Sequence, residues 1–339
     1  MRKLVPAGLS VAVFATAAHA ALFSNLVVFG DSLSDNGNAF LATAGAVPAP
    51  PAYTTVPGGL GRFTDGPDTT PAGTAGGLWH EVLAGLLGVA PAEPFLLGGT
   101  NFAVGGAQVL ADVPSSPQPI PSLMHQVDDY LLAAGGHADA NALYVFWGGA
   151  NDLYSAAETP GETPSGISAT EQNMVSSLAG DIILLSAAGA QHFLWLNLPQ
   201  LATTPRGALD LSQAPSLASA FTAASTQFQA DVAAETAVLR STLGVAISDV
   251  DIYSLYQAII MDPTKYGYTN VTTPADLNPT GDPDQYLFWD GPSHPTTTGH
   301  KLIGEAAFAA VEATLVPEPA PWMCAGAGLL LALWRRRTA

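Results

Sequence analysis

Four short apolar runs, separated by segments long enough to form helices, constrain the fold of this chain more than any other feature. The runs cover residues 26–29, 143–147, 193–196 and 245–247, and they are apolar at successive positions, not at alternate ones. Apolar strands of this kind are buried on both faces, which is typical of parallel sheets covered by helices. The alternation therefore predicts a three-layer α/β/α domain with a mainly parallel sheet.

Two helices can be placed between these runs from their residues. Ser168-x-x-Glu171 has the form of a capping box, which predicts that a helix begins there. Apolar residues then recur at helical spacing as far as Gly189, a residue type that commonly follows the end of a helix. A second helix is predicted over residues 217–239, with Phe221, Phe228 and Val232 facing the core.

The two ends of the chain have the residue patterns of sorting segments. Residues 1–20 combine a cationic start, an apolar stretch and a small-x-small site at residues 18–20, which is the pattern of a secretory signal peptide. Residues 316–339 begin with Val-Pro-Glu-Pro, continue with an apolar run over 322–334 and finish with arginines at 335–337. The length of the body between them, residues 21–315, suits one large domain or two small ones, and we expect one domain.

The tail at residues 316–339 resembles the PEP-CTERM sorting signal. Its apolar run is shorter than the roughly 20 residues that span a bilayer, but the arginines favour a short transmembrane segment, held transiently in the inner membrane with the arginines inside. The resemblance implies processing by an exosortase-type enzyme and delivery to the cell surface, the outer membrane or the exterior of a Gram-negative bacterium. The alternative is a last core helix with a basic tip, against which Pro319 and Pro321 count.

The charge of the chain excludes one class of partner. Acidic residues number 28 against 10 basic ones, and the body without its two ends holds 27 and 5, a net charge of −22. Such a surface repels phosphate backbones, so no nucleic-acid binding is expected, and docking of the body on anionic membranes is unfavourable. The one cysteine, Cys324, excludes a disulfide framework and a Cys-based zinc cluster. No cofactor and no metal are expected.

A serine near the start of the body and a histidine near its end are candidates for nucleophilic catalysis. Ser32 lies in the block 29–37, directly after the first apolar run, where a strand-to-helix turn can expose its Oγ and direct its N–H at an oxyanion. His294 lies in the block 289–296 with Asp290 close by. Histidine is the usual general base for serine, and a carboxylate can fix its tautomer.

Two further blocks offer hydrogen-bond donors. Residues 98–107 contain Gly105 and Gly106, whose backbone N–H groups are open to close approach because glycine has no side chain. Residues 148–152 place Asn151 at the end of the second apolar run, where its amide is a neutral donor suited to an oxyanion hole. Taken singly, each of these blocks is an ordinary turn or helix cap.

In order and spacing the four blocks resemble the GDSL-type branch of the SGNH hydrolases, which are esterases, lipases and acyltransferases on a flavodoxin-like three-layer α/β/α domain. Residues 61–66, 197–199, 262–268 and 286–290 extend the resemblance to about residues 24–312. It implies that Ser32 is the nucleophile and His294 its general base. It also implies an oxyanion hole made by the Ser32 N–H, Gly105 and Asn151. The glycine of the hole could be Gly105 or Gly106, and Gly105 is favoured.

The spacing before the histidine departs from the Asp-x-x-His of the family. Asp290 lies four residues before His294, because residues 291–293 hold one residue more. Glycine and proline favour a tight loop here, so we expect Asp290 still to reach the Nδ1 of His294. Asp282, Asp284 or a backbone carbonyl could orient the histidine instead.

The resemblance implies an exported serine esterase or lipase that hydrolyses a small-molecule or lipid ester through an acyl-enzyme on Ser32. One alternative is a deacetylase of an extracellular polysaccharide, which only the sorting tail suggests. Another is a non-catalytic surface protein that keeps the fold, which the altered spacing between Asp290 and His294 suggests.

Overall fold

The sheet of the domain is parallel throughout. In the computed structural model, which describes residues 22–48, 60–65, 77–115 and 117–315, four strands lie side by side in sequence order. They are β1 (Leu26–Gly30), β2 (Leu143–Trp147), β3 (His192–Leu196) and β4 (Ala246–Val250), and each neighbouring pair is parallel. The predicted parallel sheet is confirmed.

A short segment extends the sheet beyond β1. Asn101 forms a parallel bridge with Val28, and the N–H of Phe102 donates to the carbonyl of Val28 at 2.8 Å. Counted as a strand, this segment gives the spatial order 2-1-3-4-5, which is the flavodoxin-like order. In such sheets the order reverses between the first strand and its inner neighbour, here β1 and β2, and ligands bind beyond the carboxyl ends of the strands at that point.

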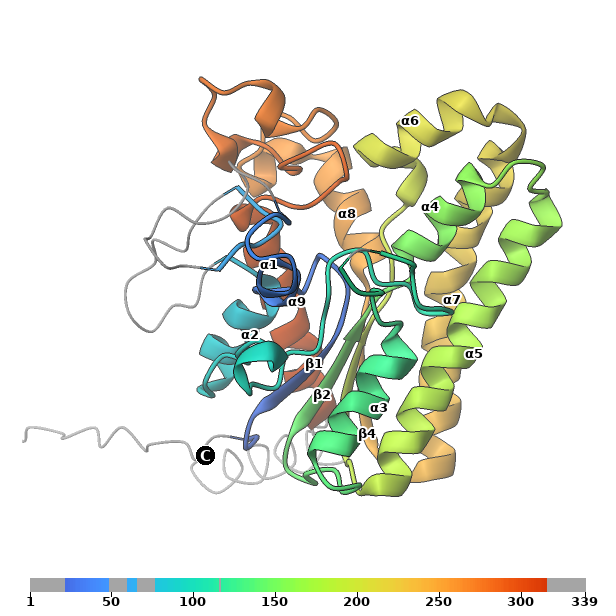
Figure 1. Cartoon of the computed structure of the whole chain (residues 1–339). Coiled ribbons are helices and arrows are strands. Elements are labelled where there is room, and N and C mark those ends of the chain that lie inside the picture. The colour runs from blue at the N-terminus through green and yellow to red at the C-terminus, as the bar shows by residue number, and fades with distance from the viewer. Residues whose placement is uncertain (1–21, 49–59, 66–76, 116, 316–339) are drawn as a thin grey trace, which may run out of the picture.

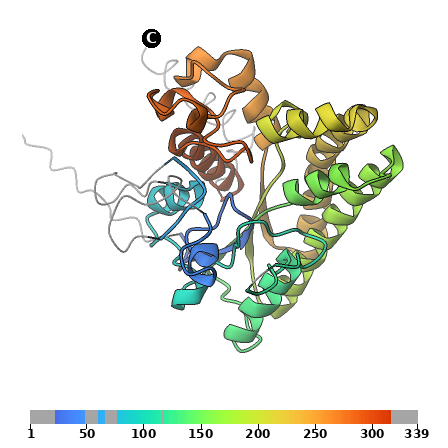
Figure 2. The ribbon, with the colours of Figure 1, turned by 45° about the horizontal axis from the view of Figure 1, so that its top comes forward.

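Helices cover both faces of the sheet, as a three-layer fold requires. Helices α3 (Leu123–Ala133), α5 (Pro164–Ala188) and α7 (Ala218–Leu243) lie on one face, and α2 (Trp79–Leu87) and α9 (Thr297–Leu315) lie on the other (Figure 1). Four further helices follow the carboxyl ends of the strands (Figure 2): α1 (Asn38–Ala42), α4 (Ala150–Glu158), α6 (Pro205–Gln213) and α8 (Ile252–Met261).

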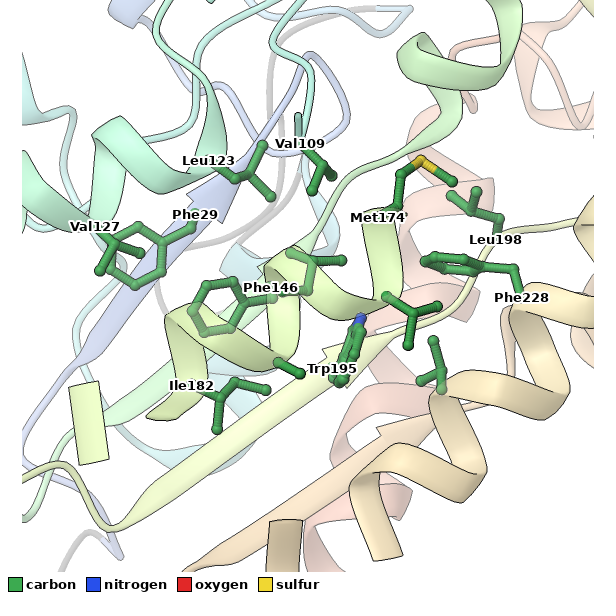
Figure 3. Close-up of a cluster of buried hydrophobic side chains, with 14 of the residues drawn as sticks. Phe29, Val109, Leu123, Val127, Phe146, Met174, Ile182, Trp195, Leu198 and Phe228 are labelled. Atoms are coloured by element: carbon green, nitrogen blue, oxygen red, sulfur yellow. The ribbon is translucent and has the colours of Figure 1, made fainter. Parts of the chain in front are cut away.

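Alternate residues of each strand enter two separate cores. Phe29, Phe146 and Trp195 face the helices α3, α5 and α7, where Ile182 and Phe228 pack near them (Figure 3). Their neighbours in the strands, such as Val28, Val145 and Leu194, belong to the second core with α2 and α9. Because both faces of the sheet are buried, the strands are apolar at consecutive positions, which is why they could be recognised in the sequence.

Two of the sequence predictions about helices need correction or adjustment. The capping box at Ser168 is wrong: α5 begins at Pro164, and the N-cap is Thr163, whose side chain accepts the N–H of Gly166. A threonine cap followed by proline at the first helical position is a strong start signal. Gly189 follows the end of α5 in a left-handed conformation, as predicted. The second helix, α7, begins one residue later and ends four residues later than predicted, and its residues Phe221, Phe228 and Val232 are buried as expected.

The predicted signal peptide (1–20) and sorting tail (316–339) lie outside the described residues. In the described ranges, no helix is both long enough and apolar enough to cross a bilayer.

Candidate active site

The turn after β1 presents Ser32 at the carboxyl edge of the sheet. The strand ends at Gly30, where any Cβ would lie only 2.6 Å from the carbonyl oxygen of Trp147, so β1 and β2 can approach closely. The carbonyl of Asp31 then accepts the N–H groups of Ser34 and Asp35, both at 3.0 Å, which closes a tight turn around Ser32. The N–H of Ser32 has no acceptor in the described part of the protein and is free for a ligand.

His294 links Ser32 to Asp290. Its Nε2 lies 2.8 Å from Ser32 Oγ, and its Nδ1 lies 2.7 Å from Asp290 Oδ2. The other carboxylate oxygen, Asp290 Oδ1, accepts the backbone N–H of His294 at 3.1 Å. Serine, histidine and aspartate therefore stand in the hydrogen-bonded order that nucleophilic catalysis requires.

The loop between Asp290 and His294 accommodates its additional residue in a compact conformation. The N–H of Trp289 donates to the carbonyl of His294 at 2.7 Å, which closes the loop at its base. Within the loop the N–H of Ser293 donates to the carbonyl of Asp290 at 3.0 Å, and Ser293 has a φ of 78°. A left-handed residue just before the histidine reverses the chain, so Asp290 can reach Nδ1 from four positions away.

The two glycine N–H groups of the turn at 104–107 differ in their hydrogen-bond partners. The N–H of Gly105 donates to Asp35 Oδ2 at 2.8 Å, so it is already engaged within the protein. Ala107 N–H donates to the carbonyl of Val104 at 3.0 Å, and Gly106 has a φ of 84°, which matches the third position of a type II turn. Within the described residues the Gly106 N–H has no acceptor.

Gly105 is required for another reason. A Cβ at this position would lie 2.3 Å from the Cζ of Phe63, and the ring of Phe63 lies 5.1 Å from the imidazole of His294, centre to centre. The missing side chain of Gly105 therefore leaves room for the phenyl ring that packs against His294.

Asn151 is held beside the glycine turn by its side chain. It lies in the first turn of α4, after Gly149, whose φ is 115°. Its Nδ2 donates to the carbonyl of Ala107 at 3.0 Å and lies 3.5 Å from Asp31 Oδ2. The next residue, Asp152, accepts the N–H groups of Val109 and Leu110 at 2.9 and 3.0 Å, which ties the chain after the turn to α4.

Asp35 is a structural residue of the site that sequence reasoning did not single out. Its carboxylate accepts the N–H groups of Gly37, Asn38 and Ala39 at 2.6–2.9 Å, and that of Gly105. It thereby joins the segment after Ser32 to the glycine turn. An Asp-Asn-Gly sequence indicates a turn or a helix start, but no sequence signal shows that the same carboxylate also binds an N–H 70 positions away.

Asp31 is a buried carboxyl group within the site. Burial raises its pKa to about 7, although the N–H of Leu33 and the nearby His294 favour the charged form. In the folded protein the group therefore holds a proton at pH values where the unfolded chain, with a pKa near 3.8, has lost it.

This difference predicts a pH-dependent stability. As the pH rises from about 4 to 7, the unfolded state releases the Asp31 proton before the folded state does. The free energy of unfolding therefore falls by up to about 4 kcal/mol, compared with a protein that has an uncharged side chain at this position. Asp31→Asn should therefore raise the melting temperature more at pH 8 than at pH 5, measured by calorimetry on the purified protein. Equal shifts at the two pH values would contradict a raised pKa for Asp31.

A small pocket opens beside these groups. It has a volume of about 60 Å³ and is lined by Ser32, Asn151 and His294, together with buried aromatic and aliphatic side chains. The pocket-lining residues outside the blocks recognised in the sequence include Tyr154, Leu201, Tyr256 and the cation Arg206. Among the described residues no group of three His, Cys, Asp or Glu side chains converges as metal ligands do. A serine hydroxyl on an imidazole that also contacts a carboxylate, with a side-chain amide lining the same pocket, is a set of groups that can carry out acyl transfer.

Comparison with known proteins identifies similar chains. The family model described as GDSL-like Lipase/Acylhydrolase matches residues 26–307. Lipase 1 of Photorhabdus luminescens is 33% identical over 56% of this chain and 24% of its own. Esterase EstA of Pseudomonas aeruginosa is 28% identical over 88% of this chain and 49% of its own. This chain thus spans about a quarter and about half of the length of these two relatives. Among solved structures, an aryl esterase of M. smegmatis matches 86% of this chain and 99% of its own at 15% identity, with a TM-score of 0.44.

Proposed function

Because this chain belongs to the GDSL-like lipase and acylhydrolase family, we propose that it hydrolyses carboxylic esters in two steps through an acyl-enzyme on Ser32. The observation that carries the proposal is the continuous contact from Ser32 Oγ through His294 to Asp290, with distances of 2.8 and 2.7 Å. The family supports the esterase or lipase activity, and the geometry supports the proposed roles of the three residues.

The first step forms the acyl-enzyme. Ser32 Oγ attacks the ester carbonyl while its proton passes to His294 Nε2, and Asp290 stabilises the resulting imidazolium. The carbonyl oxygen becomes an oxyanion, which accepts hydrogen bonds from the N–H of Ser32, the N–H of Gly106 and the amide of Asn151. His294 then gives its proton to the leaving alcohol as the tetrahedral intermediate collapses.

The second step releases the acid. Water enters in place of the alcohol, gives a proton to His294 and attacks the acyl carbonyl, and Ser32 leaves with the proton that His294 returns. Gly106 replaces Gly105 as the backbone donor in this assignment. The reason is that the Gly105 N–H is occupied by Asp35, whereas the Gly106 N–H has no acceptor in the described residues.

The experiment that tests this function is covalent labelling. A fluorophosphonate probe should label the purified body of the chain with one equivalent at Ser32, identified by peptide mass spectrometry, and a short-chain aryl ester should be hydrolysed by the unlabelled protein only. Absence of labelling in a folded sample would favour the non-catalytic alternative. That alternative rested on the altered spacing, which the loop at 290–293 accommodates. The described residues add nothing in favour of polysaccharide deacetylation.

We also propose that the chain is exported and sorted by its two ends. The support is the pattern of residues 1–20 and of residues 316–339, with an exosortase-type enzyme as the processing partner of the tail. A chain truncated before Val316 should leave the cells and accumulate in the medium, whereas the full chain should stay in the membrane fraction until it is processed. If the truncated chain stays as cell-bound as the full one, the tail is no anchor.

A further inference from the structure

The loop that carries the general base is one residue longer than the Asp-x-x-His spacing, and its last residue before the histidine is anchored from outside the loop. Ser293 has a φ of 78°, a conformation that residues other than glycine, asparagine and aspartate rarely adopt. Within the loop, the hydrogen bond from the Ser293 N–H to the Asp290 carbonyl is the one contact that supports this conformation of Ser293. The hydroxyl of Ser293, however, is fixed by α6, which is remote in sequence.

The anchor begins at the amino-terminal end of α6. The backbone N–H of Arg206 donates to Ser293 Oγ at 2.9 Å. This N–H lies in the first turn of the helix, where backbone N–H groups have no partner inside the helix. The N-cap, Thr204, accepts the neighbouring N–H of Gly207 at 3.2 Å, so the cap and Ser293 each satisfy one free donor of the helix.

The protons of the surrounding hydroxyl groups can be assigned from their partners. Thr204 Oγ1 donates to the carbonyl of Leu201 at 2.7 Å, so its only proton is used. The Tyr154 hydroxyl, 2.9 Å from Thr204 Oγ1, must therefore be the donor in that contact. Ser293 Oγ accepts from Arg206, the residue that follows Pro205 at the start of the same helix, and the Tyr154–Thr204 contact joins α4 to that helix start.

The anchor is rigid because α4 and α6 are joined around it. The guanidinium of Arg206 stacks on the Tyr154 ring at 4.4 Å and pairs with Glu158 at 2.9 Å, and both partners belong to α4. Tyr154 and Thr204 are almost fully buried. The same helix, α4, carries Asn151 in its first turn. One helix therefore bears an oxyanion donor and also supports the loop of the general base.

We propose that Ser293 is a positioning residue: its hydroxyl, held by the Arg206 N–H of α6, keeps the lengthened loop in the conformation in which Asp290 reaches His294 Nδ1. The inference rests on the proposed function, because it concerns the geometry of the triad. Without the anchor, the left-handed residue can relax and the carboxylate moves away from the imidazole.

The central test compares three substitutions of Ser293. Ser293→Ala and Ser293→Gly both remove the hydroxyl, and each should lower kcat on a short-chain aryl ester about tenfold, the effect of one lost hydrogen bond in a fixed geometry, with KM changed less than threefold. Ser293→Asn should restore most of the rate, because asparagine adopts the left-handed conformation and its amide oxygen can accept from the Arg206 N–H. A fully active Ser293→Gly would show that only the backbone conformation matters, which would overturn the anchor.

A double-mutant cycle separates positioning from general stability. In a protein that already carries Asp290→Ala there is no carboxylate to position, so adding Ser293→Ala should change kcat by less than twofold. A merely structural role would give the same tenfold loss in both backgrounds and would overturn the proposal.

The same samples distinguish this proposal from the proposed function itself. If fluorophosphonate labelling of Ser32 and ester hydrolysis are absent from the unmodified protein, the catalytic function fails. If both are present but Ser293→Ala is as active as the unmodified protein, only the positioning role fails. A low-field proton resonance for the His294 Nδ1–H bonded to Asp290 should be present in the unmodified protein and lost or shifted in Ser293→Ala; an unchanged resonance would count against the anchor.

Discussion

Ser32→Ala should lower kcat/KM for a short-chain aryl ester by a factor on the order of 10⁶, down to the background of the oxyanion donors and the pocket. The methyl group cannot attack the carbonyl, so neither the acyl-enzyme nor its hydrolysis can take place. The substitution removes one buried oxygen whose only described partner is His294 Nε2, so the fold should be kept. Initial rates under pseudo-first-order conditions, with the melting temperature as a check on folding, measure the effect.

A matched control is available on the neighbouring helix. Ser155 lies on α4 with an exposed side chain, and Ser155→Ala should keep the rate within twofold of the unmodified protein. The fluorophosphonate probe should label the Ser155 variant fully and the Ser32 variant not at all. If Ser32→Ala keeps a tenth or more of the original rate, another nucleophile performs the reaction.

Asp290→Asn should lower kcat about 10⁴-fold, since an amide cannot stabilise the imidazolium and favours the wrong tautomer of the histidine. The amide oxygen can still accept the backbone N–H of His294, which Asp290 Oδ1 accepts at 3.1 Å, so the loop itself should keep its shape. The measurement is kcat at saturating ester, with circular dichroism and melting temperature to show that the variant is folded.

Asp282 and Asp284 provide the controls for this prediction, because the sequence left them open as alternative partners of the histidine. Asp282 instead accepts the N–H of Asp284 within a short 3-10 turn at Pro283–Gln285. Asp282→Asn and Asp284→Asn should therefore leave kcat within about threefold of the original. A large loss in either variant, together with a small loss in Asp290→Asn, would assign the orienting carboxylate elsewhere.

The strands could be predicted because their signal is local. Burial on both faces makes β1, β2 and β3 apolar at successive positions, and β2 has the predicted bounds. The last strand was predicted at 245–247, but β4 runs from Ala246 to Val250. It pairs only with β3 among the strands, so its second half can include Ser248 and Asp249, the latter paired with Arg240. Because the second half of this edge strand contains polar residues, a pattern of consecutive apolar residues does not predict it.

The site was predictable as a set of blocks and less so as a set of contacts. Ser32, Asn151 and His294 line one pocket because the first two follow neighbouring strands and the third precedes the last helix. The choice between Gly105 and Gly106 depends on which N–H Asp35 occupies, and that contact joins residues 70 positions apart. Such contacts depend on the packed chain, so no pattern within either block contains them.

The positions of Ser32 and His294 along the chain have a consequence for how the protein is made. The two residues are 262 positions apart, one just after the first strand and the other just before the last helix. In the proposed mechanism, synthesis supplies the nucleophile long before the base, and a chain that stops before residue 294 lacks the base. An assay for ester hydrolysis should therefore report only on chains that have been made at least as far as His294 and have folded.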